Sequence, residues 1–312
     1  MKASAAGPNQ EERQPLNSSV RSRLRECLGS KVVEERAVSG GYTPALRRRI
    51  RLQSGEWVFV KVACNDYTRR ALERELSVLT ELQGLGASFA PAFIASDRQD
   101  PDSPLLVLED LGEALWPPPW SPSLIEEVMV TLDQLHSTRT QLAPYSEVQP
   151  ESDRGWQQVA ENPNPLLGLK LCSRPWLEAS LPRLIDHEMA LDPNGPWLTH
   201  FDLRSDNLCR TERGVVLIDW NFACAGNPLL DQGFWLPSLQ AEGGPSPETL
   251  IGEQPEIAAF VSGFFAARAG LPPIPSAPHV RKIQRTQLRT ALQWAIRALR
   301  LPASAEQAFS KR

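Results

Sequence analysis

Hydrophobic positions along the chain predict strands in its first third and helices in most of the remainder. Short apolar runs bounded by turn-forming residues predict three strands within residues 31–64 and two more at 92–95 and 104–109. Residues 68–82 predict the main helix among these strands. Its apolar residues recur at helical spacing: Leu72, Leu76, Leu79 and Leu82. From residue 121 onward helical periods dominate. The pattern predicts an α+β chain with a five-stranded antiparallel sheet, one main helix beside it and a mostly helical remainder.

A proline-rich stretch at 116–120 predicts a boundary between two lobes, and 312 residues is enough chain for two cores of ordinary size. We therefore expect a flexible tail over 1–19, a first lobe over 20–112 and a second lobe over 113–312. Residues 141–165 are rich in Pro, Asn, Asp and Glu without a clear period, which predicts a surface excursion. The helical segments expected after it cover 166–190, 246–269 and 278–301.

The composition is that of a globular protein, with 41% hydrophobic and 22% charged residues and a net charge of −4. This charge shows neither the basic footprint of a nucleic-acid-binding protein nor a polybasic membrane anchor. The five cysteines are scattered and never form a Cys-x-x-Cys pair, which favours reduced thiols. No secretory segment is recognised, and the apolar stretch 258–271 is too short to cross a bilayer. We expect a cytoplasmic protein without nucleic-acid or membrane partners; the sequence leaves its oligomeric state open.

Two apolar runs in the second half end in polar side chains that suit phosphoryl transfer. The first run ends in His200 and Asp202, and Asn207 lies five residues after the aspartate. The second run, 215–218, ends in Asp219. Phosphoryl transfer needs one carboxylate that accepts the hydroxyl proton, and oxygen ligands that hold Mg²⁺ against the phosphates. The pattern therefore predicts Asp202 as the catalytic residue and Asn207 and Asp219 as metal ligands.

This arrangement resembles the catalytic core of the aminoglycoside phosphotransferase and choline kinase-like family, distant relatives of protein kinases. In that family the stretch usually reads His-Gly-Asp-Leu-His-Pro-x-Asn, and this chain departs from it at Phe201, Arg204 and Ser205. The resemblance extends over nearly the whole chain after the tail. It implies a two-lobed protein-kinase-like fold. It also implies transfer of the γ-phosphoryl group of ATP, with Mg²⁺, to a hydroxyl of an aminoglycoside-like molecule, amino alcohol or sugar.

The resemblance also implies a nucleotide site in the first lobe. Lys61 would neutralise the phosphates, and Glu75 on the next helix would hold the lysine in place. Without the resemblance, a lone strand lysine would be interpreted as an edge residue facing water. Glu73 is the alternative partner, expected on the solvent face. Gly40 and Gly41 would form a hairpin over the phosphates, because backbone without side chains can approach oxygen closely; a tight hairpin alone would need the same glycines.

Further residues receive roles from the same resemblance. Glu109 and Leu111 fall at the hinge between lobes, where adenine would pair with backbone groups. Asp231 lies in the family's Gly-x-Pro-x-x-Asp helix start and is predicted to be structural, either as a cap or by pinning the catalytic loop. His136 is predicted to be a structural histidine, and His200 to support the loop backbone.

Two alternatives remain open. An acidic region is either a solvated helix face or a rim for a cationic acceptor. It contains Glu242, Glu248, Glu253 and Glu256. The rival to an enzyme is a catalytically silent nucleotide-binding pseudokinase module. Such a module usually lacks at least one catalytic residue, whereas this chain retains all four of Lys61, Asp202, Asn207 and Asp219.

Overall fold

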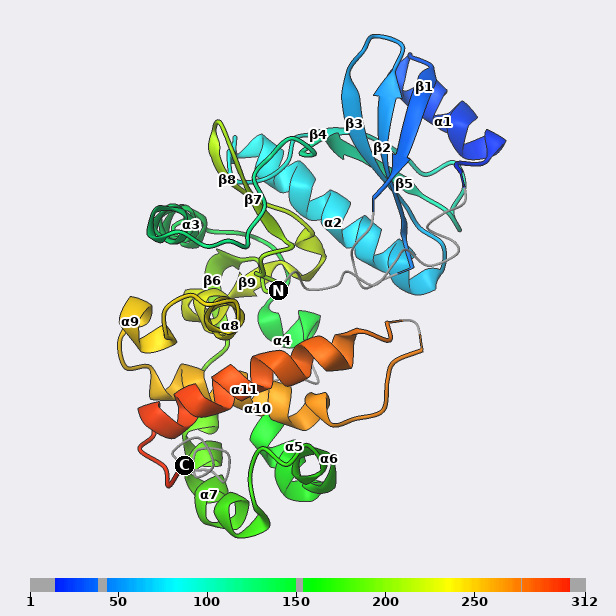
Figure 1. Ribbon diagram of the computed structural model, residues 1–312. Helices are drawn as coiled ribbons and strands as arrows, with labels where there is room; N and C mark the ends of the chain where they lie inside the picture. Colours follow the sequence, from blue (N-terminus) through cyan, green and yellow to red (C-terminus); the bar gives the residue numbers. More distant parts are fainter. Residues whose placement is uncertain (1–14, 39–43, 150–153, 276, 304–312) are drawn as a thin grey trace. The chain divides into compact units, whose positions relative to one another are not determined.

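The computed structural model describes residues 15–38, 44–149, 154–275 and 277–303 (Figure 1). Its contacts form two compact units: Met1–Pro117 with Asp206–Ala223, and Pro118–Ser205 with Cys224–Arg312. The boundary between Pro117 and Pro118 falls within the proline-rich stretch that predicts a lobe boundary. The segment Asp206–Ala223, which the sequence-based division assigns to the second lobe, packs with the first unit instead.

The first unit is built on a five-stranded antiparallel sheet with strand order β1-β2-β3-β5-β4. The strands are β1 Val32–Ala37, β2 Leu46–Leu52, β3 Trp57–Val62, β4 Phe93–Asp97 and β5 Leu105–Glu109. In β3, alternate residues point to opposite faces, so Val58 and Val60 enter an apolar cluster while Lys61 points away from it. Val20 and Leu24 of helix α1, Ser18–Leu28, pack into the same cluster and cover that face.

Helix α2, Asp66–Gly84, carries Glu75, which reaches Lys61 from the opposite side of the sheet to α1. Asn65 and Thr68 form a capping box, in which each side chain satisfies a backbone N–H at the start of the helix. The leucine stripe predicted from the sequence is buried. Figure 1 shows α2 in cyan beside the blue strands.

A short hairpin completes the first unit, formed by β7, Leu208–Thr211, and β8, Gly214–Leu217. Two arms of Arg213 at its turn hold the Glu109 carboxylate, at 2.5 and 2.6 Å, and Arg213 Nε donates to the Ser88 carbonyl. The backbones of Leu115 and Arg210 exchange two hydrogen bonds. The hairpin is therefore fastened to the end of β5.

The second unit is mainly helical. Its longer helices are α3 Pro122–His136, α7 Arg174–Ala190, α8 Pro228–Ala241, α10 Pro255–Ala269 and α11 Val280–Ala298. Its shorter helices are α4 Tyr145–Val148, α5 Gly155–Glu161, α6 Asn164–Gly168 and α9 Pro247–Ile251. A two-stranded sheet pairs β6, Asn194–Thr199, with β9, Cys224–Gly226. Helix α10 is buried on most sides and lies beside α11 (Figure 1).

The prediction of a surface excursion over 141–165 is wrong. The stretch contains α4, α5 and the start of α6, and its Tyr145 and Trp156 are fully buried. The Trp156 indole donates to the Ala259 carbonyl at 2.9 Å. Helices of one or two turns contain too few apolar residues to display a period, yet one large aromatic residue can anchor each of them.

The predicted tail, 1–19, lies largely outside the described residues, but its last residues take part in the fold. Leu16 is buried in the apolar cluster of the sheet, and the Asn17 side chain caps α1. None of the described helices combines the length and the hydrophobicity needed to cross a membrane.

Glu188, near the end of α7, is a fully buried carboxylate. Both of its oxygens accept the Trp156 N–H at the start of α5, at 3.0 Å. Burial raises the pKa of Glu188 to about 7, although backbone N–H groups of α5 oppose the rise. The folded protein therefore binds a proton here that the unfolded chain has already released, between about pH 4.5 and pH 7.

We predict that Glu188 makes the protein less stable as the pH rises through this window. A pKa raised to about 7 corresponds to about 3 kcal/mol of unfolding free energy lost across the window. Chemical denaturation at pH 5 and pH 7.5 should show that Glu188→Gln removes most of this difference. Glu178→Gln, at an exposed position of the same helix, is the control. Equal pH dependence in wild type and Glu188→Gln would contradict the prediction.

Candidate active site

One group of candidate residues lies within the first unit, where three charged side chains from separate elements meet. Lys61 Nζ lies 2.8 Å from both carboxylate oxygens of Glu75 and 2.8 Å from Asp219 Oδ1. Lys61 lies on β3 and Glu75 on α2. Asp219 lies two residues after the end of β8. The Lys61 and Glu75 side chains are 8% and 3% exposed, so water screens this cluster weakly.

Burial alone would lower the pKa of Lys61, but the Asp219 and Glu75 carboxylates outweigh it and hold that pKa above its ordinary value. Burial raises the pKa of Glu75; Lys61 opposes the rise and the negative charge of Asp219 adds to it. Two carboxylates thus share one ammonium group, so Lys61 stays charged at neutral pH. Because two carboxylates face one ammonium group, the cluster has an excess negative charge that attracts a further cation.

Glu73, the alternative partner of Lys61, lies elsewhere. Its carboxylate pairs with Arg69, one turn earlier on α2, and is 41% exposed. The difference follows from helix geometry: two residues along α2 turn a side chain from the sheet to the solvent.

Asn207 and Asp219 emerge at the same end of the β7–β8 hairpin. The pairing of Leu208 with Leu217 brings their neighbours together, and Ile218 donates its backbone N–H to the Asn207 carbonyl at 2.9 Å. Asp219 adopts a left-handed backbone conformation (φ 69°), which Asp tolerates better than most residues. This conformation turns the chain sharply at the metal-ligand candidate.

The donor set fits Mg²⁺, since an amide oxygen and a carboxylate are the hard oxygen ligands that this ion prefers. Within the described residues no cluster of three or more His, Cys, Asp and Glu side chains could hold a metal. Mg²⁺ typically takes only one or two carboxylates from the protein and completes its coordination with phosphate oxygens and water. Asn207 and Asp219 match that sparse arrangement.

A separate group of candidate residues lies in the second unit, on the loop that carries Asp202. Asp231 of α8 pins this loop. This carboxylate is fully buried and accepts the backbone N–H groups of His200 at 2.7 Å and Phe201 at 2.6 Å. His136 Nε2 lies 3.0 Å from the same carboxylate. The prediction that Asp231 and His136 are structural, with Asp231 pinning the loop, is confirmed.

His200 also acts on the loop backbone, as predicted. Its Nδ1 accepts the N–H of Asp202 at 3.2 Å, so that nitrogen carries no proton. The Asp202 side chain accepts a 2.5 Å ion-paired hydrogen bond from Arg204, one of the residues that depart from the family pattern. His200 therefore orients the backbone of Asp202, and Arg204 orients its carboxylate.

Phe201 occupies a position where the family pattern has Gly, and its backbone explains that pattern. Its φ is 65°, in the left-handed region that costs a residue with a side chain about 1–2 kcal/mol. The ring packs against Tyr145, with centroids 4.6 Å apart, and against Phe234, at 5.8 Å. Aromatic packing and the two Asp231 hydrogen bonds thus stabilise a loop that Gly would form without strain.

The remaining residues are those predicted for the nucleotide site. Gly40 and Gly41 lie outside the described residues. Glu109 uses its side chain to hold Arg213 and the Ala92 N–H, while the Leu111 carbonyl accepts from Ala114 in a turn. Burial raises the pKa of Glu109, but Arg213 and the Ala92 N–H outweigh it and hold that pKa below its ordinary value.

The structure brings Lys61, Glu75 and Asp219 into direct contact and places Asn207 in the same unit, whereas Asp202 belongs to the second unit. Sequence reasoning missed Arg213, since a charged residue in a hairpin turn resembles any solvated loop residue. It noted Arg204 only as a departure from the family. A basic residue two positions after Asp202 could have predicted the ion pair between them.

Comparisons with known proteins agree with this fold. The profile of the "Phosphotransferase enzyme family" matches residues 34–254. A solved thermostable mutant of aminoglycoside phosphotransferase APH(4)-Ia, with ADP and hygromycin B, is 13% identical, with a TM-score of 0.58 over 92% of this chain and 100% of that chain. Spectinomycin phosphotransferase APH(9)-Ia, with ADP and spectinomycin, is 13% identical, with a TM-score of 0.55 over 92% and 100%. An aminoglycoside phosphotransferase from Alicyclobacillus acidocaldarius is 15% identical, with a TM-score of 0.55 over 92% and 96%. No curated protein sequence matches the chain.

The family profile and the fold define a small-molecule kinase. The chain belongs to the phosphotransferase enzyme family, since the family profile covers well over half of it. The predicted family, the α+β fold with its five-stranded antiparallel sheet, and phosphotransferase activity are confirmed.

We predict that the strain at Phe201 can be measured with two substitutions. Phe201→Ala and Phe201→Gly both remove the ring, but only Ala keeps a side chain in the left-handed region. Phe201→Gly should therefore be more stable than Phe201→Ala by about 1 kcal/mol in chemical denaturation. At Val130, which is exposed within α3, the order should reverse. Greater stability of Phe201→Ala would refute a left-handed conformation there.

Proposed function

We propose that this protein transfers the γ-phosphoryl group of ATP, bound with Mg²⁺, to a hydroxyl group of a small molecule. The observation that carries the proposal is the buried cluster of Lys61, Glu75 and Asp219, with Asn207 at the same hairpin end as Asp219. Two carboxylates around one lysine leave an excess negative charge that would repel nucleotide phosphates. A divalent cation would neutralise this excess, so that the lysine could bind the phosphates. The cluster and its amide neighbour therefore favour a nucleotide–metal site over a structural ion pair.

Each residue has a separate task in this mechanism. Lys61 neutralises phosphate oxygens, and Glu75 keeps its ammonium group in place. Asn207 and Asp219 hold Mg²⁺, which supplies positive charge to the phosphates when bound. In this proposal Gly40 and Gly41 cover the phosphates, and the backbone of Glu109 and Leu111 binds adenine.

Asp202 acts on the acceptor. Its carboxylate accepts the proton of the attacking hydroxyl, which becomes bonded to phosphorus as the bond to the leaving ADP breaks. Arg204 and His200 limit the motion of Asp202, which favours in-line attack because misplaced nucleophiles react slowly. A silent nucleotide-binding module would need none of these restraints on Asp202.

The proposal includes a cytoplasmic location and a hydroxyl-bearing small molecule as the acceptor. The cytoplasm supplies ATP and keeps thiols reduced. Among the described residues no disulfide involves Cys27, Cys64, Cys172, Cys209 or Cys224. Two enzymes of similar fold were solved with hygromycin B or spectinomycin, so hydroxyl-bearing antibiotics belong in any acceptor panel.

The cationic acceptor considered from the acidic region remains untested, but much of that region is engaged within the protein. Glu248 pairs with Arg297 at 2.7 Å, and Glu256 lies 3.2 Å from His187. Glu242 accepts from the Trp120 indole and from the Ser205 hydroxyl. These contacts favour the alternative of a solvated, internally paired helix face.

We predict that Asp202→Asn lowers acceptor-dependent ADP release by about 10²–10⁴-fold, because the amide cannot accept the proton. ATP affinity, measured by calorimetry, should change little. Asp133→Asn, on an exposed position of α3, is the charge-matched control. An Asp202→Asn enzyme that turns over at the wild-type rate would rule out Asp202 as the base.

We also predict that two aspartates separate metal binding from stability. Asp219→Asn should weaken ATP binding in the presence of Mg²⁺ much more than in its absence, by calorimetry. Asp231→Asn should instead lower the Tm, because an amide can accept at only one of the two positions that hold His200 and Phe201. Identical Mg²⁺ dependence in wild type and Asp219→Asn would refute the metal assignment.

A further inference from the structure

The carboxylate of Glu242 holds two segments of the second unit that are far apart in the sequence. One of its oxygens accepts the indole N–H of Trp120 at 2.7 Å, and the other accepts the hydroxyl of Ser205 at 2.6 Å. Both distances are short, as expected when the acceptor carries a full charge. Each donor is neutral, so the two contacts are directional hydrogen bonds rather than ion pairs.

Ser205 belongs to the loop that carries Asp202. It lies three residues after Asp202, so even a fully extended chain would keep their Cα atoms within about 11 Å of each other. The chain leaves the second unit directly after Ser205, because Asp206 is grouped with the first unit. Ser205 is therefore the last residue of this loop that contacts within the second unit can hold.

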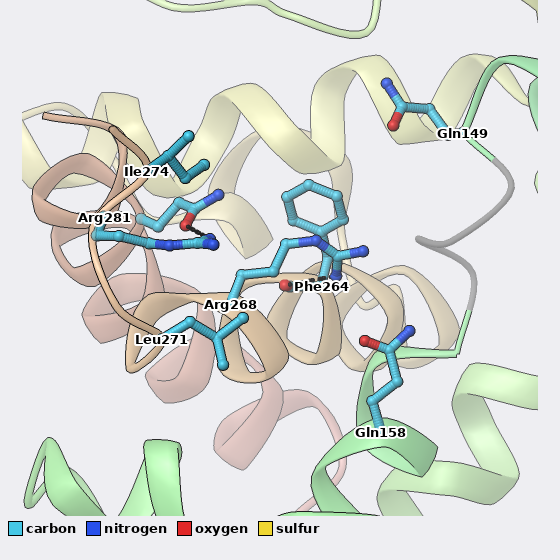
Figure 2. Close-up of a pocket in the computed structure, with 8 residues that line it drawn as sticks. Gln149, Gln158, Phe264, Arg268, Leu271, Ile274 and Arg281 are labelled. Atoms are coloured by element: carbon cyan, nitrogen blue, oxygen red, sulfur yellow. Dashed lines mark hydrogen bonds between the residues drawn. The ribbon is translucent and has the colours of Figure 1, made fainter. Parts of the chain in front are cut away.

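The start of the same loop is held by different contacts. Asp231 accepts two successive backbone N–H groups there, and the Phe201 ring packs against Phe234 at 5.8 Å. Phe234 packs at 5.0 Å against Phe264, which lines the cavity shown in Figure 2. These contacts anchor the loop on the N-terminal side of the proposed base, and the contact with Glu242 anchors it on the C-terminal side.

The indole that donates to Glu242 is itself fixed in place. Trp120 packs against the fully buried Trp235 of α8, with ring centroids 5.7 Å apart. It also lies close to the point where the chain enters the second unit, between Pro117 and Pro118. One carboxylate therefore joins a segment near the entry of the chain into this unit to the residue at its exit.

Helix stability does not explain a glutamate at this position. Glu242 is the C-cap of α8, where the partial negative charge of the helix end disfavours a carboxylate. The residue is exposed, so packing does not require a glutamate either. A residue that breaks a local rule without a packing reason points to a role in function.

We propose that Glu242 is a positioning residue, which holds the loop that carries Asp202 through its contact with Ser205. The inference rests on the proposed function for the role of Asp202, but the restraint itself can be measured without turnover. Movement of the chain beyond Ser205 would otherwise reach Asp202 through only three residues. A base that is held still reacts faster, because less of its time is spent in unproductive orientations.

The test compares Glu242→Ala, Ser205→Ala and the double variant with wild type. Hydrogen–deuterium exchange of the backbone amides in segment 200–205, without ligand, measures how often the loop opens. ADP release with ATP, Mg²⁺ and a panel of acceptors that includes hygromycin B and spectinomycin gives kcat and KM. Thermal melts give the Tm. Glu161→Ala is the matched control, because it removes an exposed glutamate from the C-terminal end of α5.

We expect Glu242→Ala and Ser205→Ala to speed exchange about threefold to tenfold, the effect of losing one hydrogen bond. The kcat should fall by a similar factor, while the KM for ATP and the Tm stay near their wild-type values. The double variant should match Glu242→Ala, because both changes break the same contact. Glu242→Gln, whose amide oxygen can still accept, should lie between Glu242→Ala and wild type. Glu161→Ala should match wild type.

Wild-type exchange rates in both single variants would overturn the inference, and so would a wild-type kcat in Glu242→Ala. A Tm lowered as far in Glu242→Ala as in Asp231→Asn would indicate a structural role and would also overturn it. Faster exchange in both variants, with no ADP release by the wild type for any acceptor, would support the restraint and contradict the proposed function. ADP release with unchanged exchange would support the proposed function and overturn the role of Glu242.

Discussion

The first unit depends on one ammonium group held between two carboxylates. Lys61 comes from the sheet, Glu75 from the helix that covers it, and Asp219 from a hairpin about 160 residues further along the chain. Removal of either carboxylate would leave a buried charge with fewer partners, which is costly in a low-dielectric interior. The ion pairs thus bind three elements together and also keep Lys61 charged.

The loop that carries Asp202 depends on a different constraint, the pinning of a strained backbone. Asp231 holds two successive N–H groups of the catalytic loop, and His200 holds the next one, that of Asp202. Phe201 adopts a conformation that favours glycine, so its ring contacts and these hydrogen bonds must offset the strain. The departure from the family's glycine gives the loop an aromatic anchor in the helical core.

The composition does not show which charged side chains of the second unit are paired with one another. The glutamates of the acidic region are mostly paired with Arg297, His187 or neutral donors. Arg281 of α11, by contrast, donates to two neutral groups, the Pro272 carbonyl and the Gln284 side chain. A net charge of −4 therefore says little about the charge that a bound molecule would meet.

The sequence by itself determined the order of elements, the sheet, the helix that carries Glu75 and the family, because periodicity and the spacing of Asp202, Asn207 and Asp219 are local properties. Only the tertiary structure decided which partners these residues meet. The grouping of the β7–β8 hairpin with the sheet, the burial of Trp156 in a stretch without a period, and the pairing of Glu248 with Arg297 are contacts between residues far apart in the chain. Local sequence patterns do not specify such contacts, because they depend on how the helices and strands pack against one another in the folded protein.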